Sequence, residues 1–452
     1  MWQLSRIALG TIQADASYEL LLWGLASLCQ QVGVSTQSFN SRACFSPHDG
    51  AKVVSGRRTR YLDSWVMGKC GCLRSLQRGA DAADLAIVQG TFLKAAGGES
   101  SDSGSATAAG GELSTLCEWL DLPRVAVVDL ALLRERGLQT PRPRVDALLL
   151  DRALDASDAV RWQTELEALW GAPVLGWMDE APALRAAIDR LRPGANPQKE
   201  LCQELGNRLR GRVRLDRLFQ LASRSPLPDV ATHWPFVGDS RRKLRVAIAL
   251  DEDFSCHFPE MLDALEAAGA VVNDFSPLKN EKLPDQTDLV LLGCGHPERH
   301  LETLAVNHCL AQSLRSYAAA GGRIFAEGSG LAYLCRQIIL PDGRSAPMTG
   351  LLPATARKLA DAGPPEPAEV IFGASCWLAD AGMPLRGYRA RSWQIEPTGS
   401  MISYANDPRN RCDLLGRGNV LGSRILTNFA AQPHLLRRFF YPYMPAPVAL
   451  GS

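Results

Sequence analysis

The sequence lacks both an excess of charge of one sign and any long apolar run. Its 49 lysines and arginines nearly balance 48 aspartates and glutamates, which leaves a net charge of +1 over 452 residues. A nucleic-acid-binding surface needs clustered excess basic charge, so we expect no nucleic-acid partner. No window of about 18 residues is apolar and free of charge, which argues against a membrane-spanning helix. Residues 1–6 lack the basic and apolar segments of a signal peptide, and we expect a cytoplasmic protein.

Closely spaced cysteine pairs are also missing. The 12 cysteines are spread along the chain without a C-x2-C pair, and Cys70-Gly71-Cys72 is too tight for an ordinary zinc knuckle. Disulfide scaffolds are short and dense in cysteine, whereas this chain is long and dilute. We therefore expect reduced thiols and no metal site.

Patterns of buried strands and helices alternate in both halves of the chain. A strand over 5–10 precedes a helix over 18–32 in the first half. In the second half, a strand over 244–250 opens a similar series that includes a helix over 301–320. This alternation predicts mainly parallel sheets with helices on both faces.

The length also bears on domain organisation. At about 150 residues per domain, the chain has room for two or three domains. The alternating pattern lapses over 225–243, where prolines precede the basic run Arg241-Arg242-Lys243. We predict a first domain over 1–224, a linker over 225–243 and a second domain over 244–452.

Several short sequence motifs in the second half resemble those of a known family. They are GCGHPE at 293–298, AAGG at 319–322, PMTGLLP at 347–353 and RGNV at 417–420. In this order they resemble the amidotransferase half of the cobyrinic acid a,c-diamide synthases. In the first half, LDSWVMG at 62–68 and ADLAIV at 83–88 resemble the same family.

The resemblance implies an α/β fold of two doubly wound three-layer domains. The N-terminal domain would be a P-loop-type domain akin to dethiobiotin synthetase, and the C-terminal one a class I glutamine-amidotransferase-like domain. It also implies an enzyme that uses glutamine and ATP-Mg to convert tetrapyrrole carboxylates into amides.

The nucleotide site of the family is degenerate in this sequence. A P-loop needs glycines, a lysine for the phosphates and a hydroxyl for Mg²⁺. The corresponding segment contains Asp15, Ser17, Tyr18 and Glu19, with Tyr18 at the lysine position and Glu19 at the hydroxyl position. Three further positions, a lysine and two aspartate-type Mg²⁺ ligands in the family, hold Asn40, Cys44 and Gln89. Because amides and thiols are poor ligands for Mg²⁺, we expect no bound ATP-Mg and no other cofactor.

The glutaminase site is degenerate as well. The family's E-C-G-G-L pattern falls on 327–331, which places Gly328 at the cysteine nucleophile. The histidines of the final S-Y-x-H-x-H-F pattern become Leu426 and Asn428. The acid and histidine of an upstream G-[HY]-E-x-H element become Arg389 and Arg391. Acyl transfer needs the thiolate and its base, so we predict no catalytic residues here.

Neighbouring side chains offer alternatives to the lost groups. Ser329 is one residue past the nucleophile position, and Cys294 lies in the loop that supplies oxyanion-hole amides in the family. A new hydrolase or transferase could use either one. His296 and His300 are spaced i, i+4, which suits either a metal site or a solvated loop.

A basic cluster in the second half is a candidate ligand site. Arg386, Arg389 and Arg391 lie close together in sequence, and guanidinium groups suit carboxylates. Trp393 is a candidate stacking residue. A solvated basic loop and a core tryptophan are the simpler interpretations of the same residues.

The leading hypothesis is therefore a pseudoenzyme of a glutamine-hydrolysing amide ligase. It would be a non-catalytic homologue of the cobyrinic acid a,c-diamide synthases that acts as a binding or scaffolding subunit. We expect a homo- or hetero-oligomer, with an active amidotransferase or another enzyme as partner, or a tetrapyrrole as ligand. The alternative is ATP-dependent amidation of tetrapyrrole carboxylates with unconventional sites.

Overall fold

The computed structural model describes residues 3–13, 15–92, 110–137, 144–224, 226–228, 243–279, 281–407 and 411–442. The chain forms two compact units: residues 1–42 with 46–232, and residues 43–45 with 233–452. Both units are α/β, as predicted. Most of the predicted linker, 225–243, lies outside the described residues, so its boundaries stay a prediction.

The first unit is built on a seven-stranded sheet in the order β3-β2-β4-β1-β5-β6-β7, in which each adjacent pair is parallel. Its strands are β1 (Ser5–Thr11), β2 (Thr36–Asn40), β3 (Arg60–Tyr61), β4 (Leu85–Thr91), β5 (Arg124–Asp129), β6 (Ala147–Ala153) and β7 (Val174–Asp179). Successive side chains of a strand point to opposite faces. Ile7 and Leu9 of β1 therefore join one core and Ala8 joins the other.

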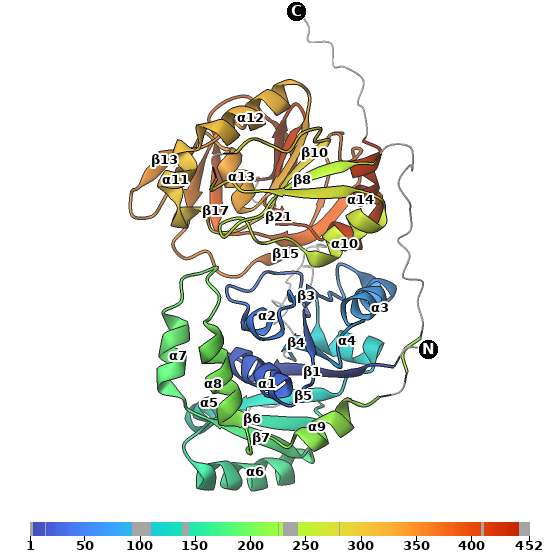
Figure 1. Cartoon of the computed structure of the whole chain (residues 1–452), viewed down its shortest axis with the longest axis vertical. Helices are drawn as coiled ribbons and strands as arrows, with labels where there is room; N and C mark the ends of the chain where they lie inside the picture. Colours follow the sequence, from blue (N-terminus) through green and yellow to red (C-terminus); the bar gives the residue numbers. More distant parts are fainter. Residues whose placement is uncertain are drawn as a thin grey trace, which may run out of the picture. The chain divides into compact units, whose positions relative to one another are not determined.

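Helices cover both faces of this sheet (Figure 1). One face packs against α1 (Glu19–Gln31), α2 (Gly50–Ser55), α7 (Pro182–Asp189), α8 (Lys199–Leu209) and α9 (Leu215–Ala222). The other packs against α3 (Gly68–Gly79), α4 (Leu113–Leu120), α5 (Leu130–Arg136) and α6 (Ala156–Trp170). This is the predicted three-layer arrangement.

The second unit has a seven-stranded mixed sheet in the order β18-β19-β20-β11-β10-β8-β9. Its strands are β8 (Arg245–Ala249), β9 (Val271–Phe275), β10 (Leu289–Leu292), β11 (Arg323–Glu327), β18 (Ile402–Asn406), β19 (Cys412–Arg417) and β20 (Val420–Ser423). The five strands from β20 to β9 are parallel, whereas β18 and β19 run antiparallel at one edge.

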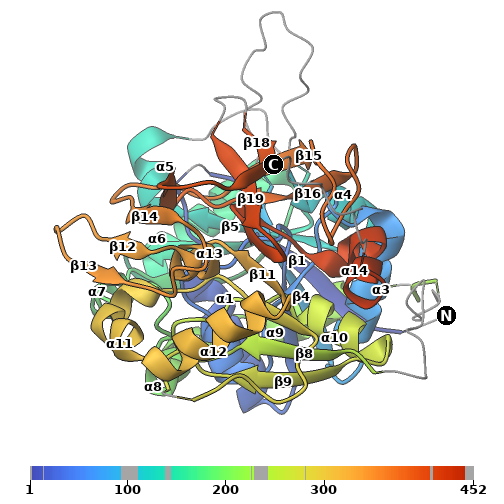
Figure 2. The same ribbon diagram turned by 90° about the horizontal axis from the view of Figure 1, so that it is seen from above.

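Two small sheets, absent from our sequence-based expectations, extend this unit. One contains β12 (Gln337–Ile339), β13 (Ser345–Pro347), β14 (Ala354–Lys358) and β17 (Trp393–Pro397). Figure 2 shows its strands β12, β13 and β14 together. The other contains β15 (Glu366–Ile371), β16 (Pro384–Arg389) and β21 (Ile425–Leu426).

The helices of the second unit are α10 (Pro259–Ala267), α11 (Leu301–Val306), α12 (His308–Ala319), α13 (Ser329–Leu334) and α14 (Pro433–Phe440), with 3-10 turns η1 (Pro297–Arg299) and η2 (Phe429–Ala431). The prediction of a single helix over 301–320 is wrong, because two helices, α11 and α12, occupy this range. Asn307 separates α11 from α12, because its side chain accepts a hydrogen bond from the Leu310 amide and caps α12.

One further property follows from the helices. Among the residues that the structure describes, no helix is long and apolar enough to cross a membrane.

Candidate functional site

The first candidate site lies where β1 ends and α1 begins. Residues 12–18 connect these two elements, and Tyr18 stands at the N-cap of α1. Asp15 has a left-handed φ of 66°, and its carboxylate pairs with Arg136 at 2.9 Å, both groups being well exposed. The strand-loop-helix frame of a phosphate site is therefore present, but a carboxylate stands in its loop.

Tyr18 and Glu19, at the start of α1, are not cations that could pair with a phosphate. Burial raises the pKa of Tyr18 to about 12 and also raises the pKa of the Glu19 carboxyl. Ser17 is exposed, and its hydroxyl accepts a hydrogen bond from the Glu19 amide at 3.3 Å. A neutral phenol and an acidic side chain thus occupy the positions expected to hold lysine and a hydroxyl.

The neighbouring strand ends carry amides. Asn40 ends β2 and is paired in register with Gln89 of β4, and both residues are buried. Cys44, half-buried, follows β2 by four residues. Mg²⁺ selects hard anionic oxygens, which these side chains lack. The residues present therefore do not fit ATP-Mg in the mode that the resemblance implies.

The second candidate site lies at the sharp turn between β11 and α13. Gly328 has φ 57° and ψ −113°, a conformation that residues with side chains rarely adopt. A Cβ atom built there would lie 2.9 Å from the Cβ of Cys294 and 3.3 Å from Cδ2 of Leu426. The turn has the geometry that exposes a nucleophile at a strand-to-helix junction. The space for that nucleophile is filled by other side chains.

Cys294 fills this space as a neutral thiol. It faces Cys256 across an antiparallel bridge, in which the Cys256 amide donates to the Cys294 carbonyl at 3.2 Å. A hydrogen bond with Cys256, burial and the nearby Glu327 raise the pKa of Cys294 well above its usual value. Only the thiolate is strongly nucleophilic, so this thiol is a poor attacking group near neutral pH.

Glu327, the last residue of β11, is buried beside this thiol. Burial raises its pKa to about 8, although a hydrogen bond from the Thr427 amide at 2.9 Å favours the ionised form. At neutral pH the carboxyl is therefore mostly protonated. It is not an effective base for the thiol beside it.

Ser329 is held by two hydrogen bonds. Its hydroxyl donates to the Gly295 carbonyl at 2.7 Å and accepts from Nε1 of Trp393 at 3.1 Å, and the residue is buried. This geometry fixes the α13 start against the loop after β10. It favours a structural role for the serine over the nucleophilic alternative.

At the two positions that hold histidines in the family, the side chains present have structural roles. Leu426 is buried in β21. Asn428 donates to Glu260 of α10 at 3.3 Å and accepts from the Ala430 amide at 3.2 Å, which caps η2. Neither side chain could deprotonate a thiol.

The remaining histidines near this turn each contact a different group. His296 contacts Glu298 at 3.3 Å, and His300 contacts Asp253 at 2.9 Å. Among the described residues, no group of three or more metal-ligating side chains is suitably arranged. His257, which the sequence did not single out, lies 2.7 Å from the Ala249 carbonyl. His296 and His300 each have a carboxylate partner of their own.

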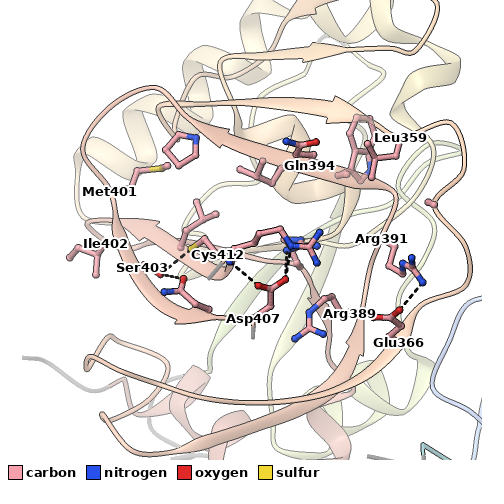
Figure 3. Close-up of a pocket in the computed structure, with 18 of the residues that line it drawn as sticks. Leu359, Glu366, Arg389, Arg391, Gln394, Met401, Ile402, Ser403, Asp407 and Cys412 are labelled. Atoms are coloured by element: carbon pink, nitrogen blue, oxygen red, sulfur yellow. Dashed lines mark hydrogen bonds and ion pairs between the residues drawn. The ribbon is translucent and has the colours of Figure 1, made fainter. Parts of the chain in front are cut away.

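The basic cluster divides between two environments. Arg386 pairs with Glu369 at 2.5 Å and does not line the pocket that contains the other residues of the cluster. Arg389, Arg391 and Trp393 line a pocket of about 670 Å³ within the second unit (Figure 3).

Arg389 and Arg391, the two arginines of the predicted cluster that line the pocket, each pair with a carboxylate. Arg391 pairs with Glu366 at 2.7 Å at the exposed rim. Arg389 binds the fully buried Asp413 with both its Nε and Nη2 atoms, at 3.0 and 2.7 Å. The sequence did not single out Asp413, because this partner lies 24 residues from Arg389.

The chain is similar to several known proteins. The CobB/CobQ-like glutamine amidotransferase domain matches residues 245–361. A cobyrinate a,c-diamide synthase of Syntrophotalea carbinolica is 28% identical, over 96% of this chain and 97% of its own length. A hydrogenobyrinate a,c-diamide synthase of Streptomyces coelicolor is 27% identical, over 86% and 87%. A crystal structure of a glutamine amidotransferase, 18% identical, covers 43% of this chain and 97% of its own, with a TM-score of 0.35.

Proposed function

The chain belongs to the cobyrinate a,c-diamide synthase family, and from this premise we propose that it is a non-catalytic member that acts as a binding or scaffolding subunit. The observation that carries the proposal is the turn at Gly328. It keeps the backbone of a nucleophile turn, while Cys294 and Leu426 occupy the space where a nucleophile would project.

The state of the two acidic groups at this turn supports the proposal. The pKa values of Cys294 and Glu327 are both raised, so neither thiolate nor carboxylate predominates near neutral pH. Hydrolysis of an amide by a cysteine needs an ionised thiol and a base that takes its proton. Leu426 and Asn428, at the two family histidine positions, supply no such base.

The first unit supports the same proposal independently. Amidation driven by ATP needs cations around the phosphates and hard oxygen ligands for Mg²⁺. The loop before α1 instead carries Asp15, α1 begins with Glu19, and the adjacent strands β2 and β4 carry Asn40 and Gln89. The nucleotide site and the glutaminase site thus both lack residue types that the family's reactions need, although the fold is retained.

The proposed binding role is tested by thermal unfolding of the full chain with two kinds of ligand. We expect no shift with ATP-Mg and a shift with a corrinoid or uroporphyrin as the tetrapyrrole probe. A ligand at about 100 times its dissociation constant adds about 2.7 kcal/mol to the free energy of unfolding. A shift with ATP-Mg contradicts the loss of the nucleotide site. No shift with either tetrapyrrole favours a role with a protein partner only.

The partner role is tested by co-purification with an active amidotransferase. We expect the chain to form a complex with an active homologue from the same organism, measured by size-exclusion chromatography with light scattering. Failure of both this association and tetrapyrrole binding would contradict the proposed binding or scaffolding role.

A further inference from the structure

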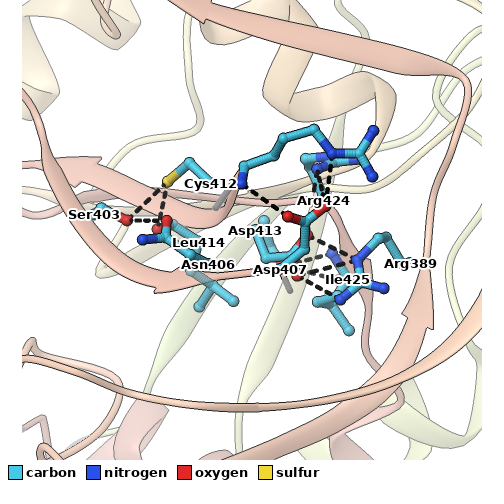
Figure 4. Close-up of polar contacts among 11 residues, drawn as sticks. Arg389, Ser403, Asn406, Asp407, Cys412, Asp413, Leu414, Arg424 and Ile425 are labelled. Atoms are coloured by element: carbon cyan, nitrogen blue, oxygen red, sulfur yellow. Dashed lines mark hydrogen bonds and ion pairs between the residues drawn. The ribbon is translucent and has the colours of Figure 1, made fainter. Parts of the chain in front are cut away.

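The pocket in the second unit, which we call the arginine pocket, has walls of two kinds. Its volume of about 670 Å³ falls within the range of small-molecule sites, about 300–1,000 Å³. Apolar atoms come from Trp393, Ile395, Met401 and Leu415. The pocket is also lined by guanidinium groups, of which Figure 3 labels Arg389 and Arg391 and Figure 4 labels Arg424. A ligand that fits both walls needs an apolar body and a negative charge.

Five charged side chains form a network on the polar wall: Arg389, Arg411, Arg424, Asp407 and Asp413 (Figure 4). Three guanidinium groups and two carboxylates leave a net charge of 3 − 2 = +1. Both carboxylates are buried, with side-chain exposures of 2% for Asp407 and 0% for Asp413. The network therefore carries one positive charge more than its own acids balance.

The first two arginines have close partners. Arg389 binds Asp413 through two of its nitrogens, and Arg411 donates from Nε to Asp407 at 2.6 Å. Burial alone would lower the pKa of Arg389, but its hydrogen bonds with Asp413 raise it. These two guanidinium groups use the two available carboxylates.

Arg424, the third guanidinium group of the network, has no carboxylate partner as close as those of Arg389 and Arg411. Its side chain is only 8% exposed, and its Nη1 atom lies 3.4 Å from Asp413 and 3.9 Å from Asp407. Both distances exceed the 2.7–3.2 Å that is usual for a hydrogen bond. Its Nε atom is buried and has no hydrogen-bond partner among the described residues. Burial, as the largest cause, lowers the pKa of this guanidinium.

A buried donor without a partner costs free energy, and a buried charge costs more unless it is paired. Arg424 lines an open pocket, although its Nε atom is itself inaccessible. Other charges lie at the rim: Asp361 is exposed, and Arg391 is neutralised by Glu366. Of the pocket's guanidinium groups, Arg424 is thus the one least closely paired with a carboxylate.

We propose that the arginine pocket binds an organic acid with a single negative charge on an apolar body, with its carboxylate at Arg424 and its body against Trp393, Met401 and Leu415. A carboxylate there would give the guanidinium the close partner that Asp407 and Asp413 do not provide. One loosely paired guanidinium group suits one carboxylate. The inference concerns only the second unit and does not depend on the proposed loss of catalysis.

The test uses two probes of one shape, 1-naphthoate and its neutral amide 1-naphthamide, titrated into the full chain by calorimetry. We expect naphthoate to bind about 10–100-fold more tightly, because hydrogen bonds to a charged group are worth more than neutral ones. Equal affinities, or no detectable binding of naphthoate, would overturn the inference.

Three variants locate the bound probe. Arg424→Met should abolish the preference for naphthoate over the amide. Arg386→Met is the matched control, because Arg386 pairs with Glu369 outside the pocket, and it should bind both probes as the wild type does. Naphthoate binding that is unchanged by Arg424→Met would place the ligand elsewhere and overturn the proposal.

Ile402→Trp keeps the test valid if Arg424→Met fails to fold. Ile402 lines the pocket and is 50% exposed, so a larger side chain can be accommodated there without repacking the core. We expect the indole to occupy the pocket and to weaken naphthoate binding at least about ten-fold. Unchanged affinity in this folded variant would contradict the proposed location.

Discussion

Cys294 fills the space in front of Gly328, so that a Cβ atom on Gly328 would lie 2.9 Å from the Cβ atom of Cys294. The two residues come from the loop after β10 and from the turn after β11, which are adjacent parallel strands. A side chain at position 328 and the present side chain at 294 therefore compete for the same volume. A side chain at position 328 would thus require Cys294 to move.

This relationship predicts that Gly328→Cys destabilises the protein and does not restore glutamine hydrolysis. The backbone strain and the crowding each cost about 1–3 kcal/mol, so we expect a loss of about 2–6 kcal/mol in the free energy of unfolding. Chemical denaturation measures it. Gly343→Ala is the matched control, since Gly343 has a φ of 86° but open space around it. That variant should lose only about 1 kcal/mol. Equal losses would show that crowding by Cys294 contributes nothing.

A second prediction concerns thiol reactivity. Cys70 is exposed on α3, whereas Cys294 is held beside Cys256 with a raised pKa. We expect iodoacetamide at pH 7.5 to modify Cys70 well before Cys294, as followed by peptide mass spectrometry, because the thiolate is the reactive form. Faster labelling of Cys294 would instead indicate an activated thiol and favour a relocated nucleophile.

The buried carboxyl of Glu327 predicts a dependence of stability on pH. Its pKa is about 8 in the folded protein, against an ordinary value near 4.5. Between these two pH values the folded protein holds a proton that the unfolded chain releases. The free energy of unfolding therefore falls as the pH rises, by up to about 1.4 kcal/mol per unit, and the effect levels off above the folded pKa.

Glu327→Gln removes this titration, so the pH dependence of its unfolding free energy should be flatter than that of the wild type between about pH 5 and pH 8. Denaturation in a series of buffers measures both slopes. Parallel curves for the two proteins would mean that the carboxyl is ionised in the fold and could act as a base.

The two ion pairs of the arginine pocket should differ strongly in their effect on stability. Asp413→Asn leaves Arg389 buried without its carboxylate, which costs about 3–5 kcal/mol for a pair of this kind. Glu366→Gln breaks the exposed pair with Arg391 and should cost less than about 1 kcal/mol. Similar losses in chemical denaturation would contradict the assignment of Asp413 as the buried centre of the network.

Local sequence patterns predicted several of the parallel strands, among them β1 and β8. The apolar runs that became β1 and β8 sit inside sheets covered on both faces, so burial alone marks them. The resemblance supplied the positions of Gly328 and of the nucleotide loop, and both fall at strand-to-helix junctions as it implied.

The arginine pocket was only partly predictable. Arg389, Arg391 and Trp393 are close in sequence, but Asp413 and Arg424 join them through the pairing of β19 with β20 and of β16 with β21. Pairing between strands distant in sequence is set by tertiary structure, which no local pattern records. The break at Asn307 was missed because the apolar periodicity continues on both sides of the cap.

The most direct test of the central claim is glutamate release by the purified full chain in the presence of glutamine and ATP-Mg. The cobyrinate a,c-diamide synthase of Syntrophotalea carbinolica serves as the comparison under the same conditions. We predict no release above the rate without protein, and no effect of a thiol alkylator. Release that the alkylator abolishes would contradict the account, because it would require an active thiol despite Gly328.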